Sequence, residues 1–261
     1  MCLIAFSWLA HPRFKLALIA NRDEFHARPT APAGWLDPQR RVFGGRDLVA
    51  GGGWLQFAGD GRIAAVTNVR QGRPEAAPRS RGALVAEFAA ARTDAAAYLD
   101  ELARNAGEYG RFNLLVGDGA ALYHASNVPE FSAQRIAPGV YGLSNGGFDA
   151  PWPKLERARA GLAAWLDAAA AQAPTPHWEP LLQLLADTQP AEDAALPDTG
   201  VGIELERRLS PIFIRGDSYG TRSSTVLLVT DAGQFWFAER RHGPGGGCIG
   251  DSGHSGWLEP A

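Results

Sequence analysis

Residues 2–8, CLIAFSW, and residues 15–24, KLALIANRDE, are predicted to form two strands joined by a short connection. His11, Pro12 and Arg13 lie in that connection, which makes the pair hairpin-like. The first strand begins at Cys2, directly after the initiator methionine, and the second ends on four polar residues. This hairpin indicates both the fold and the candidate chemistry.

Cys2 has two interpretations. If Met1 is removed, the residue carries a thiol and a free α-amine, and an α-amine that titrates near pH 8 can act as a general base. One residue would then supply nucleophile and base together. If Met1 is retained, the Cys2 nitrogen lies in a peptide bond and is no base. Cys2 would then be a small apolar residue at the start of an edge strand.

The composition restricts the class of protein. The chain has 261 residues, 46% of them hydrophobic and 20% charged, with a net charge of -3. This is typical of a globular protein, and it gives no indication of binding to nucleic acid or to an anionic membrane. No apolar segment is long enough to span a membrane, and the short apolar run at residues 2–10 lacks the basic region of a secretory signal.

The chain has two cysteines, Cys2 and Cys248, and they are far apart in the sequence. Two such thiols form neither a disulfide framework nor a zinc cluster, so we expect a reducing, cytoplasmic location. The histidines show no metal-ligand spacing, and we expect no metal.

The predicted elements alternate between groups of strands and pairs of helices. This order favours an α+β fold with mainly antiparallel sheets and helices packed outside them. We find no domain boundary and expect a single domain over residues 1–261, with a flexible glycine-rich tail at about 243–255. Residues 25–38, which contain three prolines, are predicted to be a loop. Further strands are expected at 54–58, 62–67, 112–116, 121–124, 139–143, 212–214, 223–229 and 234–238, and helices at 81–91, 94–104, 153–171 and 177–186.

The tetrad Asn21-Arg22-Asp23-Glu24 ends the second predicted strand. Because alternate residues of a strand face opposite sides, one pair of these side chains faces the region of Cys2. Arg22 is suited to lower the pKa of the thiol, and a carboxylate is suited to orient the α-amine. The alternative is a surface ion pair in a turn.

Three further polar residues follow predicted strands or precede one. Asn68, in Thr67-Asn68-Val69-Arg70, and Asn145, in Leu143-Ser144-Asn145-Gly146, offer amide donors suited to an oxyanion, or they are turn asparagines. Arg222, between Gly220 and Ser224, is suited to face an anionic group or the thiolate, or it forms a structural salt bridge.

Taken together, these segments resemble the NRDE family, the family of transport and Golgi organisation proteins of the second type. The resemblance extends in order from Cys2 to Ser224 and covers nearly the whole chain. It is carried by Met1-Cys2-Leu3-Ile4, Asn21-Arg22-Asp23-Glu24, Arg28-Pro29-Thr30, Gly53-Trp54, Thr67-Asn68, Leu143-Ser144-Asn145, Pro151-Trp152-Pro153-Lys154 and Gly220-Thr221-Arg222-Ser223-Ser224.

The resemblance implies an Ntn-hydrolase-like αββα sandwich, in which two antiparallel sheets lie between helical layers. It also implies comparison with cysteine Ntn hydrolases of the choloylglycine and penicillin V acylase type. Those enzymes use an N-terminal cysteine, an arginine and an aspartate of the second strand, two asparagines and a late arginine. The matching residues of this chain are Cys2, Arg22, Asp23, Asn68, Asn145 and Arg222.

The chain departs from those acylases at the second strand. The acylases have the arginine and the aspartate three residues apart, whereas Arg22 and Asp23 are adjacent. In the simplest ungapped register, Asn21 and Glu24 take their places. Either a β-bulge returns Arg22 and Asp23 to the pocket, or the acid/base arrangement differs.

Besides a purely structural or interaction role, two functions remain open at this point. The first is a cysteine amidohydrolase that acts on a non-peptide C–N bond of a small molecule, with Asn21, Glu24 and Trp54 as candidate substrate-binding residues. The second is a non-enzymatic carrier of haem or another hydrophobic ligand, which uses the same cleft. Trp54 suits an apolar ligand or the core. No cofactor is expected unless haem is that ligand, and the sequence indicates no oligomeric state.

Overall fold

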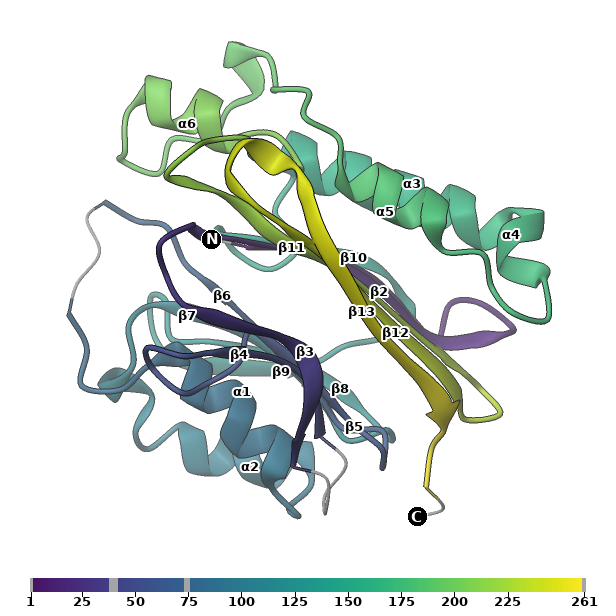
Figure 1. The fold of residues 1–261 in the computed structure, drawn as a ribbon. Coiled ribbons are helices and arrows are strands. Elements are labelled where there is room, and N and C mark those ends of the chain that lie inside the picture. Colours follow the sequence, from purple (N-terminus) through teal and green to yellow (C-terminus); the bar gives the residue numbers. More distant parts are fainter. Residues whose placement is uncertain (1, 38–41, 73–75, 260–261) are drawn as a thin grey trace.

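Two antiparallel sheets lie face to face in the computed structural model, which describes residues 2–37, 42–72 and 76–259 (Figure 1). The six-stranded sheet has the order β10-β1-β2-β11-β12-β13, and the seven-stranded sheet has the order β3-β4-β5-β6-β7-β8-β9. The first sheet comprises β1 (Cys2–Trp8), β2 (Phe14–Phe25), β10 (Gly139–Leu143), β11 (Tyr219–Thr230), β12 (Gln234–His242) and β13 (Cys248–Trp257). The second comprises β3 (Thr30–Asp37), β4 (Val42–Asp47), β5 (Leu55–Ala58), β6 (Ile63–Asn68), β7 (Phe112–Gly117), β8 (Leu122–Ser126) and β9 (Ser132–Arg135).

Helices cover the outer face of each sheet (Figure 1). Helices α1 (Arg81–Ala90) and α2 (Ala95–Leu102) lie on the seven-stranded sheet, and their N-caps are Ser80 and Asp94. Helices α3 (Pro153–Asp167), α4 (Ala169–Gln172) and α5 (Glu179–Leu185) lie on the six-stranded sheet. A further helix, α6 (Ile203–Leu209), and short 3-10 turns at Ala106–Glu108, Asp193–Ala195 and Pro244–Gly246 complete the described elements.

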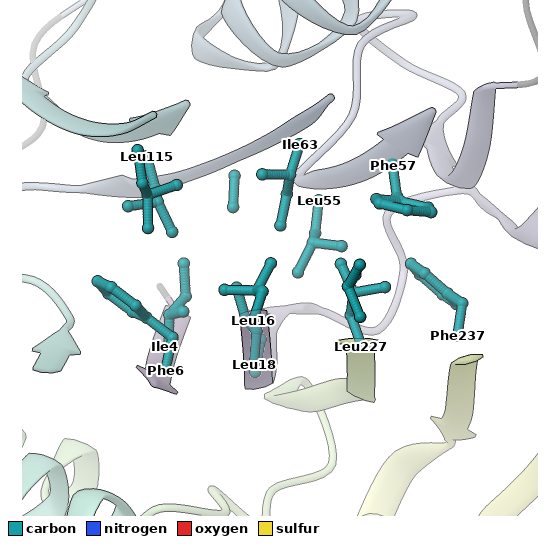
Figure 2. Packing of buried hydrophobic residues seen from close by; sticks show 14 of the residues in the cluster. Ile4, Phe6, Leu16, Leu18, Leu55, Phe57, Ile63, Leu115, Leu227 and Phe237 are labelled. Carbon is teal, nitrogen blue, oxygen red and sulfur yellow. The ribbon is translucent and has the colours of Figure 1, made fainter. Parts of the chain in front are cut away.

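The two faces of the β1–β2 hairpin contribute to different cores. Ile4 and Leu18 point into the layer between the two sheets, together with Phe57 of the opposite sheet (Figure 2). Leu3 and Ile19 point the other way, toward the helices of the six-stranded sheet. This separation follows from the two-residue period of a strand, and it makes β1 and β2 apolar on both faces. The expected αββα arrangement is confirmed.

Four sequence expectations differ from the structure. One is the helix expected at 153–171, which is interrupted at the extended residue Ala168 and forms α3 and α4. The proline-containing segment expected as a loop contains β3, an edge strand whose register shifts between Ala31 and Gly34. An edge strand with a bulge tolerates Pro32, because no neighbouring strand requires its missing N–H. The segment 212–214, expected as a strand, is buried but irregular, since the Ile214 N–H is bonded by the hydroxyl of Thr221.

The glycine-rich segment expected as a flexible tail forms β13 instead. Its backbone pairs with β12 from Gln234↔Trp257 to His242↔Cys248. Because the free edge of β12 supplies the hydrogen-bond partners, β13 needs no hydrophobic alternation of its own. Within the described residues, no helix is long and apolar enough to cross a membrane.

A candidate active site around Cys2

Cys2 begins β1 at one end of the sandwich, where it lines a pocket of about 270 Å³. It lies directly opposite Arg22 of β2 in the strand register, and the Ser144 hydroxyl donates to the Cys2 carbonyl oxygen at 2.9 Å. Both contacts fix the backbone that carries the sulfur. The pocket is lined by Cys2, Arg22, Asp23, Glu24, Arg28, Asp47, Gly53, Trp54, Val66, Asn68, Ala77, Arg79, Ser80, Arg81, Gly82 and Gly110.

Burial controls the thiol of Cys2. It raises the pKa of the sulfur above its ordinary value, and the nearby carboxyl of Asp23 acts in the same direction. The Arg22 guanidinium and the Asp23 backbone N–H, which donates to the sulfur, lower the pKa but do not outweigh burial. The resting thiol is therefore protonated at neutral pH, and a nucleophilic role requires a base at the site.

Asp23 is the carboxylate most deeply buried beside Cys2. The hydroxyl of Thr221, on the neighbouring strand β11, donates to Asp23 Oδ1 at 2.6 Å. Burial raises the pKa of Asp23, while Lys154, Thr221 and Arg22 favour its charged form. Lys154 comes from the first turn of α3 and donates to the Leu209 carbonyl at 3.1 Å, and burial lowers its pKa to about 8.

An asparagine pair bridges the two sheets. Asn145, which follows β10, is fully buried and donates through Nδ2 to the Asn68 carbonyl at 2.9 Å and to Asn68 Oδ1 at 3.0 Å. Asn68 ends β6 and lines the pocket. Because its Oδ1 accepts from Asn145, the Asn68 Nδ2 group is left as a donor, and it has no hydrogen-bond partner among the described residues.

Ion pairs form the rim of the pocket. Arg28 Nε lies 2.5 Å from Asp47 Oδ2, and Arg22 Nη2 lies 3.4 Å from the same oxygen and 3.8 Å from Glu24 Oε2. The Arg22 guanidinium also stacks on the Trp54 ring, with Cζ 4.4 Å from the ring centroid. Arg22 is thus held by Asp47, Glu24 and the Trp54 ring. Trp54 lines the pocket and is also part of the core between the sheets.

The Gly51–Gly53 segment brings α1 against the pocket. A Cβ on Gly52 would lie 2.2 Å from the Gly82 carbonyl carbon, so only glycine permits this approach. The Gly53 N–H donates to the Gly82 carbonyl at 3.0 Å. The first residue of α1, Arg81, is placed in the pocket by these contacts.

Two residues predicted for the site lie elsewhere. Asn21 faces the helical layer, where its Nδ2 donates to the carbonyls of Leu185 and Ile212 at 2.8 and 2.9 Å. Arg222 is the extra residue of a bulge in β11, and its guanidinium donates to the carbonyls of Phe25 and Arg28. Arg22, Asp23 and Glu24 line the pocket together with Cys2. The β-bulge considered for the second strand lies in the neighbouring strand β11 instead.

A second cavity, of about 490 Å³, adjoins the first, since Glu24, Asn68, Arg81 and Gly110 line both. Its walls are more apolar and include Phe25, Val69, Val201, Leu205 and Leu209. Phe25 is 58% exposed and Leu205 is 40% exposed, so the cavity has apolar surface available to a ligand.

Several residues of the pocket, including Arg28 and Arg81, were not among the site residues predicted from the sequence. Arg28 was part of the quoted Arg28-Pro29-Thr30 segment, but its pairing with Asp47 of β4 depends on a strand that the sequence did not indicate. Arg81 carried a usable signal, because a cation in the first turn of a helix is unfavourable and suggests another role.

Comparison with known proteins places the chain in a family. A profile described as Transport and Golgi organisation 2 matches residues 1–244. The chain belongs to the Transport and Golgi organisation 2 family. The homologue from Bos taurus is 34% identical over 259 residues, and that from Homo sapiens is 31% identical over 259 residues, each match covering 92% of both chains. The Drosophila melanogaster protein is 28% identical over 265 residues and covers 92% of this chain and 91% of that protein.

The Transport and Golgi organisation 2 proteins thus match this chain over almost its whole length, with the described pocket inside the matched region. Among solved structures, the chain is similar to a mutant of the conjugated bile acid hydrolase from Clostridium perfringens, with a TM-score of 0.46, 9% identity, and coverage of 99% of this chain and 92% of that one.

Proposed function

We propose that this member of the Transport and Golgi organisation 2 family is a cysteine amidohydrolase of the N-terminal nucleophile type, which acts on a small-molecule C–N bond. The observation that carries the proposal is the Asn68 Nδ2 donor, which Asn145 orients in the pocket that Cys2 lines. A nucleophile and a prearranged amide donor in one cavity are the parts that acyl transfer requires. Met1 lies outside the described residues, so its removal is part of the proposal.

The first chemical step follows from the protonated state of the thiol. The Cys2 α-amine accepts the thiol proton as the sulfur attacks the amide carbon, and a C–S bond forms. Negative charge develops on the carbonyl oxygen and is stabilised by Asn68 Nδ2. The tetrahedral intermediate collapses, the C–N bond breaks, and the α-ammonium returns its proton to the leaving amine.

The second step releases the acyl group. Water attacks the Cys2 thioester, the α-amine accepts a proton from that water, and the C–S bond breaks as the sulfur recovers a proton. Asp23 lies beside the sulfur with one oxygen bonded by Thr221, which suits it to hold the α-ammonium formed in each step. Arg22 favours negative charge on the leaving sulfur.

The decisive experiment controls the residue that precedes Cys2. A cleavable N-terminal extension is fused directly to Cys2, so that proteolysis leaves Cys2 as the first residue. We expect hydrolysis of N-acyl p-nitroanilides only after cleavage, and the uncleaved fusion is the matched control. Cleaved Cys2→Ala should lose about 10³-fold or more in kcat, and cleaved Cys248→Ala, altered at an exposed residue of β13, should not.

Two outcomes would contradict the proposal. One is equal hydrolysis before and after cleavage of the extension. The other is a mature cellular protein that retains Met1, shown by its intact mass, while the protein is functional.

A second function, carriage of a hydrophobic ligand, is favoured by the apolar walls of the adjoining cavity. It requires saturable binding that does not depend on the Cys2 sulfur. Titration of haem, and of a fatty acid, into the wild type and Cys2→Ser would distinguish it, because a carrier retains its affinity in the variant without turning over any amide.

A further inference from the structure

An arginine at position 81 is unfavourable for the helix that it begins. It is the first residue of α1, whose first turn holds no acidic side chain. Helix N-termini carry partial positive charge, so a cation there is unfavourable and a carboxylate would stabilise the helix. Helix stability therefore does not explain an arginine at this position.

The Arg81 guanidinium also lacks a protein partner. It forms no hydrogen bond or ion pair with any residue in the described ranges, although it lines the pocket of Cys2. Of the other guanidinium groups that line this pocket, Arg28 and Arg22 are paired with Asp47. Arg79 is paired with Glu87 outside the pocket, on α1. Arg81 is the cation of this pocket left available to a ligand, within the part of the chain that the structure describes.

Arg81 and Cys2 line the same pocket, and Arg81 is exposed to solvent there. The pocket walls lower its pKa by partial desolvation, while Cys2 and Glu24 act in the opposite direction and Arg28 adds to the lowering. The same side chain lines the adjoining apolar cavity, so it stands where the two cavities join. A guanidinium at such a junction can form two parallel hydrogen bonds to a carboxylate, sulfonate or phosphate.

We infer that Arg81 is a specificity-determining residue, which binds an anionic group of the substrate beside the scissile C–N bond. This inference rests on the proposed amidohydrolase function for the identity of that bond. The preferred substrates are then acyl amides that carry an oxyanion next to the amide, and uncharged analogues of the same shape bind weakly.

Binding to the Cys2→Ala variant tests the inference without turnover. The two probes are N-octanoylglycine and N-octanoylglycinamide, which differ in one charge, and the readout is the ratio of their dissociation constants by calorimetry. We expect the carboxylate to bind about 10- to 100-fold more tightly, as for a charge-assisted hydrogen bond. Adding Arg81→Gln should bring the ratio close to one, and Arg81→Lys should preserve part of it.

Arg79→Gln in the same background is the matched control. Arg79 lines the same pocket but is already paired with Glu87, so its removal should change the ratio less than about twofold if direct contact, and not the general field, is responsible. Equal affinity for the two probes, no binding of either, or a preference that survives Arg81→Gln would each overturn the inference.

The same probes separate this inference from the proposed function. If the cleaved enzyme with Cys2 as its first residue hydrolyses neither probe while the Arg81-dependent preference persists, the amidohydrolase proposal fails and Arg81 still binds the anion. If it hydrolyses both probes with equal kcat/KM, the specificity role fails and the amidohydrolase proposal stands.

Discussion

At the scale of single residues, the site depends on hydrogen bonds that orient the side chains and backbone of the pocket residues. Asn68 is useful as a donor only because Asn145 occupies its Oδ1 atom. Asp23 is held by Thr221, and the Cys2 backbone is held by Ser144. Each supporting residue is buried, so its geometry is restricted by packing as well as by the bond itself.

Asn145 should therefore control turnover without contacting the substrate. We expect Asn145→Ala to lower kcat for amide hydrolysis by about 10²-fold with little change in KM, because the freed Asn68 amide no longer points its donor at the oxyanion. Steady-state kinetics with the cleaved enzyme measure this. Gln172→Ala, which removes an amide on α4 that lines neither cavity, is the control and should leave kcat unchanged. A large rise in KM with unchanged kcat would assign Asn145 to ground-state binding instead.

At the scale of elements, the site lies where the ends of the two sheets meet. Asn68 ends β6 of one sheet, whereas Cys2 begins β1 of the other. Helix α6 closes this end through the buried pair of Arg70 Nη2 and Glu206 Oε2, 2.7 Å apart, and Thr199 donates to the same carboxylate. The Arg70 N–H donates to the Asn145 carbonyl at 2.7 Å, which connects α6 to the asparagine pair.

Breaking this pair should destabilise the end of the molecule that holds the site. Glu206→Ala leaves a buried guanidinium without its carboxylate, and we expect a loss of about 3–5 kcal/mol in the free energy of unfolding. Urea unfolding followed by tryptophan fluorescence measures it. Arg207→Ala, the neighbour on the exposed face of α6, is the control and should leave the unfolding midpoint unchanged. Equal midpoints for the two variants would show that α6 does not contribute to the cooperative fold.

At the scale of the whole molecule, a buried polar network connects the two sheets behind the site. His124 Nε2 lies 3.1 Å from Asn113 Oδ1, and Asn113 Nδ2 donates to the carbonyl of Gly146 at 2.8 Å, beside Asn145. Asn113 belongs to the seven-stranded sheet, and Gly146 lies in the segment after β10, which ends at Leu143 in the six-stranded sheet. The network therefore helps to hold the sheets in register near the pocket.

This network should make stability depend on pH. Burial lowers the pKa of His124 from 6.5 to about 4, so between these values the unfolded chain binds a proton that the folded protein does not. The free energy of unfolding is therefore unaffected by His124 above pH 6.5. It falls as the pH is lowered toward 4, and this group accounts for a loss of about 3 kcal/mol.

Urea unfolding at several pH values between 7 and 4.5 measures this loss. His124→Gln, which keeps a donor toward Asn113, should reduce the slope of stability against pH over that range. His177→Gln, altered at an exposed histidine, should not. Identical slopes for the wild type and His124→Gln would refute the assignment.

The sequence alone determined most elements and part of the site. Alternating apolar residues and helix caps are local signals, and they located the strands of both hairpins and helices α1 and α2. The motifs identified Cys2, Arg22, Asp23 and Asn68, which the structure brings to one pocket, and Asn145, which orients Asn68.

Tertiary structure decided the rest, because it depends on partners far away in the chain. The edge strands β3 and β13 exist through backbone pairing with β4 and β12, which needs no hydrophobic pattern of their own. Arg222 donates to backbone carbonyls and does not line the pocket. Arg81 lines the pocket because α1 packs against the Gly51–Gly53 segment. Which arginine faces the thiol is fixed by the relative placement of elements, and no local sequence signal encodes that placement.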